Sequence, residues 1–210
     1  MKIPTFNNYI GVIEVILEIN EKLKQEADTF LYDMGLKKML SCFGDVQITG
    51  SYALDLMVWR DLDIFVDISK VSQRDIYQFA NEIFEQFKPI WFETKNTFEE
   101  ETGCPKGYFV GFETLLNNQL WNFDIWFTNI AHIEENENYI NDIRDLMTEP
   151  AREIIIDIKA KVHKHPQYGT EFFSIDVYQS VINEEIKTLN EFKEWLKKKR
   201  NIDYSELVGD

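Results

Sequence analysis

Polar and apolar residues alternate over residues 61–68, which predicts a strand with one acidic and one apolar face. The acidic face carries Asp61, Asp63, Phe65 and Asp67, and the apolar face carries Leu62, Ile64, Val66 and Ile68. Side chains two residues apart on a strand lie roughly 6–7 Å apart, so Asp61 and Asp63 can hold one divalent cation or a close pair. Neighbouring carboxylates repel each other, and a bound cation would remove that repulsion. A solvated strand face is the alternative interpretation.

Other apolar runs predict four more strands and several helices. Strands are expected at residues 46–49, 90–94, 108–116 and 120–127, the last two joined in a hairpin by Asn117-Asn118. Apolar residues at helical spacing predict helices over residues 8–25, 28–42 and 150–164, another from about residue 134, and one or two over residues 174–199. Strands mixed with helices come first and helices alone follow, so the chain is expected to have an α/β half and a helical half that meet near residue 130.

Ser72 and Asp75 are spaced as in a capping box and predict the start of a further helix, which Pro89 follows. Its apolar residues repeat at helical spacing and are interpreted as core: Ile76, Phe79, Ala80, Ile83, Phe84 and Phe87.

Gly50-Ser51 follows the first predicted strand and precedes Tyr52-Ala53-Leu54-Asp55-Leu56, which is expected to form a short helix. Glycine lets the backbone approach a ligand closely, and the start of a helix offers free N–H groups. With the Ser51 hydroxyl, these groups suit a phosphate, although a plain turn is the alternative.

Gly50-Ser51, a short helix and Asp61-x-Asp63 on an apolar strand together resemble the signature of the nucleotidyltransferase superfamily that includes DNA polymerase β. The resemblance is closer to its small bacterial members, the antibiotic and minimal nucleotidyltransferases. It implies an α/β (α+β) fold with a mixed sheet flanked by helices in residues 1–130 and a helical region in residues 131–210.

The resemblance also implies a third carboxylate on a later strand, for which Asp124 is the candidate. Asp61, Asp63 and Asp124 would then bind Mg²⁺, with two ions ~3.5–4 Å apart, and transfer a nucleoside monophosphate from an NTP such as ATP. Gly50 and Ser51 would hold phosphates, and Lys159 is the candidate basic contact. A structural role is the alternative for Asp124, and solvated lysines at a helix end are the simpler interpretation of Lys161 and Lys164.

Composition limits the partners. The net charge of −15, from 22 basic and 37 acidic residues, argues against a broad nucleic-acid-binding face. Cys42 and Cys104 are isolated, which indicates neither a zinc site nor disulfides and favours a reducing cytoplasm. No apolar run approaches the ~18 residues of a membrane span.

The acceptor is open at this stage. Active relatives often carry Ser or Thr before the first acid, whereas this chain has Arg60, which is expected to reach a phosphate or to pair with Asp45 or Asp55. The leading hypothesis is transfer to a hydroxyl of a small molecule or protein. The alternatives are a catalytically inactive nucleotide-binding module and an antitoxin-like protein that binds a protein partner.

Overall fold

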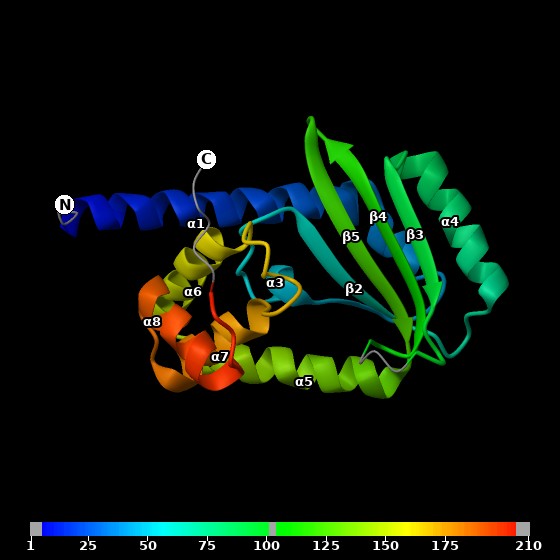
Figure 1. Cartoon of the computed structure of the whole chain (residues 1–210). Coiled ribbons are helices and arrows are strands. Elements are labelled where there is room, and N and C mark those ends of the chain that lie inside the picture. Colours follow the sequence, from blue (N-terminus) through cyan, green and yellow to red (C-terminus); the bar gives the residue numbers. More distant parts are fainter. Residues whose placement is uncertain (1–5, 101–103, 205–210) are drawn as a thin grey trace. The chain divides into compact units, whose positions relative to one another are not determined.

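The computed structural model describes residues 6–100 and 104–204, with side chains from residue 15 onward (Figure 1). The chain has two compact units. Residues 22–142 form the first unit, and the described residues on either side of that segment form the second. These limits fall inside α1 and α5, whereas the two-domain division predicted near residue 130 stays a prediction. Within the described ranges, no helix has the length and apolar character needed to cross a membrane.

The first unit is built on a five-stranded mixed sheet of order β1-β2-β5-β4-β3. Its strands are β1 (Val46–Ile48), β2 (Asp61–Asp67), β3 (Trp91–Asn96), β4 (Gly107–Leu116) and β5 (Gln119–Thr128). β2 pairs with β5 in parallel, and every other neighbouring pair is antiparallel. All five predicted strands are confirmed, as is the α+β class. The hairpin between β4 and β5 turns at Asn117 and Asn118, whose φ angles are 50° and 60°, as a tight hairpin turn requires.

Helices of this unit lie against the sheet. They are α1 (Phe6–Asp28) from Lys22 onward, η1 (Thr29–Asp33), α2 (Leu36–Leu40), α3 (Gly50–Ala53), α4 (Gln73–Phe87) and the first part of α5 (Ile130–Leu146). The single helix predicted over residues 28–42 is wrong. α1 continues into the π-helical turn η1, and the chain then breaks at Gly35, where φ is +77°. Glycine adopts this left-handed conformation without the steric cost that a Cβ would bring.

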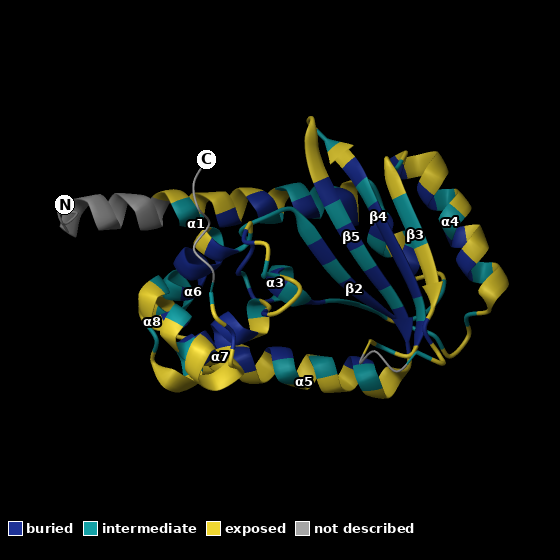
Figure 2. Ribbon diagram, in the orientation of Figure 1, coloured by how far each residue is buried: buried dark blue, intermediate teal, exposed yellow. Residues whose placement is uncertain are grey.

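The core lies on the apolar face of the sheet. Phe30 of η1 sits at its centre, with its ring 4.9 Å from that of Phe123 and 5.5 Å from that of Trp121. Leu62 and Ile64 of β2 are fully buried on the same face. Figure 2 shows that the middle of β4 is buried and that buried and intermediate residues alternate along β5, whereas β3 and α4 carry many exposed residues. The alternation that predicted a one-sided strand at β2 therefore reflects real burial.

The capping box that predicted α4 is present. Ser72 accepts a hydrogen bond from the backbone N–H of Asp75, whose carboxylate accepts one from the N–H of Ser72. Four of the six predicted core positions are buried, namely Ile76, Phe79, Ile83 and Phe87. Phe84 is 49% exposed and lies against Phe92 at 5.0 Å, so its assignment to the core is wrong.

The described residues of the second unit are mainly helical. After α5 it contains α6 (Glu149–Val162), α7 (Ser174–Glu184), α8 (Leu189–Trp195) and the π-helical turn η2 (Leu196–Arg200). Thr148 caps α6, and Thr188 forms a capping box with Glu191 at the start of α8. Fully buried apolar residues hold the unit together: Ile155, Ile158, Val162, Phe172, Val177, Phe192 and Leu196.

Burial in α4 predicts a contrast between two aromatic residues of the same helix. Phe79 is fully buried and contacts the rings of Phe43 and Phe127, both at 5.5 Å, whereas Tyr77 is 61% exposed. We expect Phe79→Ala to lower the free energy of unfolding by roughly 3–5 kcal/mol, because it leaves a cavity. Tyr77→Ala, the matched control, should change it by about 0.5 kcal/mol or less. Urea denaturation of both variants measures the difference, and equal losses would contradict the assigned core.

Candidate functional site

The three predicted acidic residues share one face of the sheet. β2 and β5 run in parallel with Asp63 directly opposite Asp124 and Asp61 directly opposite Asn122. Residues paired in register point to the same side of a sheet, so the side chains of all four gather beside each other. Each of the four is partly exposed, in contrast to the buried residues on the opposite face. The sequence predicted the two strands and the three acids, and the parallel register brings the acids together.

Asn122 joins two of these acids, and the sequence analysis missed it. Its side-chain amide donates to Asp61 Oδ1 at 2.7 Å and to Asp124 Oδ1 at 3.3 Å. Asn122 precedes Asp124 by two residues, so it shares the face of Asp124 on β5. That spacing was the available signal. Its significance depends on the pairing with β2, which cannot be read from one strand alone.

The environment of Asp124 disfavours its charge. Burial, followed by the neighbouring carboxylate of Asp61, raises the pKa of Asp124 to about 6, while the Asn122 amide opposes the shift. More distant charges on Lys95 and Glu93 act in opposite directions on this pKa. Ionised Asp124 is therefore unfavourable here without a cation.

The carboxylate oxygens of Asp61, Asp63 and Asp124 are the kind of ligand that Mg²⁺ prefers. Asn122 supplies amide N–H donors to Asp61 and Asp124, and these donors satisfy the carboxylates as a cation would. Across the described ranges, no three Asp, Glu, His or Cys side chains are arranged to hold a metal ion directly. Binding of Mg²⁺ by Asp61 and Asp124 would therefore require the Asn122 amide to move away from the carboxylate oxygens that it contacts.

Gly50 touches the site directly. Its φ is +61°, and a Cβ added to it would lie 2.0 Å from Asp63 Oδ2, so only a glycine leaves room for this carboxylate. The backbone N–H of Thr49 donates to the Asp63 carbonyl at 2.9 Å, which fixes the approach. The predicted short helix exists but begins at Gly50 and ends at Ala53, two to three residues earlier than expected.

Two contacts anchor the segment around Ser51. Thr49 Oγ1 donates to Asn136 Oδ1 of α5 at 2.5 Å, and Tyr52 Oη donates to Asp28 Oδ1 of α1 at 2.6 Å. Burial and the bond to Asp28 raise the pKa of Tyr52. Ser51 itself is 8% exposed. A phosphate contact for Gly50 and Ser51 stays a prediction.

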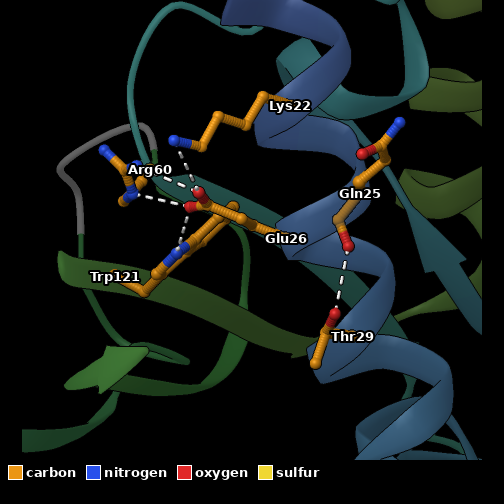
Figure 3. A network of polar contacts seen from close by, with 6 residues as sticks. All are labelled: Lys22, Gln25, Glu26, Thr29, Arg60 and Trp121. Carbon is orange, nitrogen blue, oxygen red and sulfur yellow. Dashed lines mark hydrogen bonds and ion pairs between the residues drawn. The ribbon is translucent and has the colours of Figure 1, made fainter. Parts of the chain in front are cut away.

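Arg60 contacts neither Asp45 nor Asp55, so its predicted ion pairs are wrong. Its guanidinium donates to both carboxylate oxygens of Glu26 on α1, at 2.7 and 3.1 Å (Figure 3). Asp55 instead pairs with Lys24 at 2.7 Å. The sequence could not reveal this partner because Glu26 lies 34 residues earlier in the chain.

Asp67 lies at the end of β2, as predicted. Its carboxylate accepts from the backbone N–H of Ser69 at 3.1 Å and from the Ser69 hydroxyl at 2.5 Å. It therefore serves the turn after the strand.

Lys159 belongs to the second unit. It is fully buried in α6, and its ammonium donates to Tyr178 Oη at 3.0 Å. Lys161 pairs with Asp157 at 2.5 Å on the same helix. The proposed phosphate contact of Lys159 stays a prediction.

Beyond Asp124, the same face of the sheet carries aromatic residues. The ring of Trp126 lies 4.6 Å from that of Phe109, and Gly111 of β4 is opposite Asp124. A Cβ on Gly111 would lie 2.8 Å from the Phe109 ring and 3.2 Å from Trp91, so both rings lean over this glycine. Trp91 is 43% exposed.

Solved structures share this arrangement of elements. The Cid1 poly(U) polymerase, in a form bound to Mg and 3'-dATP, is similar with a TM-score of 0.56 and 17% identity over 85% of this chain and 55% of that chain. The non-canonical poly(A) polymerase complex GLD-2–GLD-3 is similar with a TM-score of 0.52 and 12% identity over 89% and 59%. The fold is that of the polymerase-β-like nucleotidyltransferases.

This nucleotidyltransferase fold is recognised by structure alone. No protein-family model and no curated protein sequence matches the chain. The chain spans little more than half the length of the two polymerases above. A third structure, the GLD-2/RNP-8 complex, has a TM-score of 0.51 and 10% identity over 94% of this chain and 78% of that chain.

The raised pKa predicts that Asp124 destabilises the metal-free protein near neutral pH. Because the pKa of Asp124 is about 6 when folded against an ordinary 3.8, the penalty is absent below pH 3.8 and complete above pH 6. We expect Asp124→Asn to raise the free energy of unfolding at pH 7.5, measured by urea denaturation, by at most about 3 kcal/mol. The advantage should shrink as the pH falls from 6 to 4. Glu134→Gln, an exposed substitution on α5, should show no such trend in chelator-containing buffer.

Proposed function

We propose that the chain binds Mg²⁺ through Asp61, Asp63 and Asp124 and transfers a nucleoside monophosphate from an NTP to an acceptor hydroxyl. The main support is the in-register pair Asp63 and Asp124 on parallel strands. Asp61 lies two residues before Asp63 on the same face, and the Asn122 amide donates hydrogen bonds to both Asp61 and Asp124. The shared fold of the nucleotide-polymerising enzymes adds to it.

The reaction that fits is a displacement at the α-phosphorus of the nucleotide. The acceptor oxygen forms a bond to that phosphorus, the bond to the β-phosphate oxygen breaks, and pyrophosphate leaves. Bound Mg²⁺ would neutralise the phosphates and hold the triphosphate in line. Asp124 would complete a second ion position or accept the hydroxyl proton.

The acceptor we propose is a small molecule or a protein. The net charge of −15 would repel a long nucleic acid. Glu93 and Glu113 lie on the same face of the sheet as the three acids, Asp61, Asp63 and Asp124. Glu93 pairs in register with Gly111, which in turn pairs with Asp124. Glu113 pairs in register with Asn122.

Nucleotide binding tests the proposal first. Calorimetry would measure binding of non-hydrolysable ATP and GTP analogues with Mg²⁺ to the wild type and to Asp61→Asn/Asp63→Asn. We expect metal-dependent micromolar binding that the double variant loses, because two of three ligands are neutralised. Asp67→Asn is the matched control, since Asp67 shares the strand and face but serves the turn at Ser69.

The outcomes separate the candidate functions. Binding followed by transfer of labelled nucleotide to one of a set of polyols, a protein or an RNA oligonucleotide identifies the acceptor class. Binding without transfer to any acceptor favours the inactive nucleotide-binding module. A folded wild type that binds no nucleotide rejects the enzyme and favours a protein-binding role.

Gly50 provides a second, independent prediction. Gly50 and Gly35 both have positive φ, but a Cβ would strike Asp63 only at Gly50, whereas Gly35 has nothing within 4 Å. Alanine at either position should cost about 1–2 kcal/mol of stability from the left-handed backbone. Only Gly50→Ala should also weaken Mn²⁺ binding, by about tenfold or more, because the Asp63 carboxylate must move. Equal metal affinity in both variants would contradict the role assigned to Asp63.

A further inference from the structure

The carboxylate of Glu26 gathers donors from three elements. Besides the two hydrogen bonds from Arg60, it accepts a hydrogen bond from Trp121 Nε1 at 3.3 Å and lies 3.9 Å from Lys22 Nζ (Figure 3). Arg60 immediately precedes β2 and Trp121 lies on β5, so one side chain of α1 holds both parallel strands. The fork of a guanidinium on a carboxylate fixes direction as well as distance.

The strand residues held in this way are the neighbours of site residues. Arg60 precedes Asp61, and Trp121 precedes Asn122. The backbone N–H of Asn122 donates to the Arg60 carbonyl at 3.0 Å, and the Asn122 amide then reaches Asp61 and Asp124. A continuous series of contacts therefore leads from Glu26 to two of the three acids.

The network is well shielded. Side-chain exposure is 15% for Glu26 and 23% for Arg60, and Trp121 is fully buried with its ring 6.2 Å from Phe123. Lys22 is 70% exposed and distant, so it contributes little. Charge-assisted hydrogen bonds in a shielded place are stronger and less mobile than surface pairs.

We propose that Glu26 is a positioning residue that sets the geometry of Asp61, Asn122 and Asp124 through Arg60 and Trp121. Arg60 thus holds the site from the side of α1 rather than contacting a phosphate. This inference rests on the proposed function for its effect on turnover. Its structural part, the placement of the Asn122 amide, does not depend on metal or nucleotide.

Glu26→Gln is the informative change, because glutamine keeps the size and one oxygen acceptor but loses the charge and the fork. The matched control is Lys24→Gln on the same helix, which removes the 2.7 Å ion pair to Asp55 and the contact of the Lys24 ammonium with the Tyr52 ring at 5.8 Å. Arg60→Lys is the conservative variant, since it keeps the charge opposite Glu26 but provides a single point of contact.

Three readouts apply to the full chain. We expect Glu26→Gln to shift the NMR resonances of the Asn122 side-chain amide and accelerate its hydrogen exchange without metal. The variant should bind Mn²⁺ about tenfold more weakly, and kcat should fall by roughly 10- to 100-fold with the KM for nucleotide nearly unchanged, because a displaced group costs turnover more than binding. Arg60→Lys should be intermediate, and Lys24→Gln should match the wild type in all three.

The results distinguish the two proposals. A wild type that binds neither Mn²⁺ nor nucleotide rejects the proposed function. The NMR resonances and hydrogen exchange of the Asn122 side-chain amide in Glu26→Gln then test the positioning role by themselves. An active wild type with an unchanged amide, affinity and kcat in Glu26→Gln overturns the positioning role and leaves the proposed function standing. If Glu26→Gln fails to fold, Arg60→Lys carries the test, and wild-type behaviour of that variant also overturns the role.

Discussion

The parallel pairing of β2 with β5 is the constraint on which the candidate site depends. It sets Asp63 opposite Asp124 and Asp61 opposite Asn122. A slip of one residue would turn every side chain of β2 to the other face. Such a slip would expose Leu62 and Ile64, which are fully buried, and drive the acids into the core. The hydrophobic face of the strand therefore determines where the acidic face lies, so packing and chemistry are fixed by the same register.

The acidic face carries a cost that the apolar face offsets. Burial, followed by the neighbouring charge of Asp61, makes the ionised form of Asp124 unfavourable, and the Asn122 amide relieves only part of this. Functional sites are the places where a local rule of stability is broken while the remaining structure supports it. Here the support comes from the opposite side of the same strands, where Phe30 packs on Trp121 and Phe123.

Local patterns in the sequence were enough to predict the strands, the capping box at Ser72 and the shared strand face of Asp61 and Asp63, whereas Asp124 was predicted from the resemblance to nucleotidyltransferases. They failed where a backbone or distant partner decided the structure. The break at Gly35 follows from one left-handed residue inside an otherwise helical pattern, and α3 begins at Gly50 because Thr49 is extended. The partner of Arg60 and the role of Asn122 depend on contacts 34 and 61 residues away in sequence, which no periodicity can reveal.

The shared fold does not decide the acceptor, and the proposal of a small-molecule or protein acceptor rests on the charge around Asp124. On the edge side of the site, β3 and β4 contribute Glu93 and Glu113 to the face of the triad. Lys95 is also on β3, and its ammonium is paired with Glu93 at 3.1 Å. Under the proposed function, a nucleic-acid acceptor that crossed this edge would meet the Glu113 carboxylate as well as the Glu93–Lys95 pair, and phosphate contacts dominate the affinity of proteins for nucleic acids. A neutral or cationic acceptor with a single reactive hydroxyl would meet no such repulsion, and the exposed ring of Trp91 offers it an apolar surface.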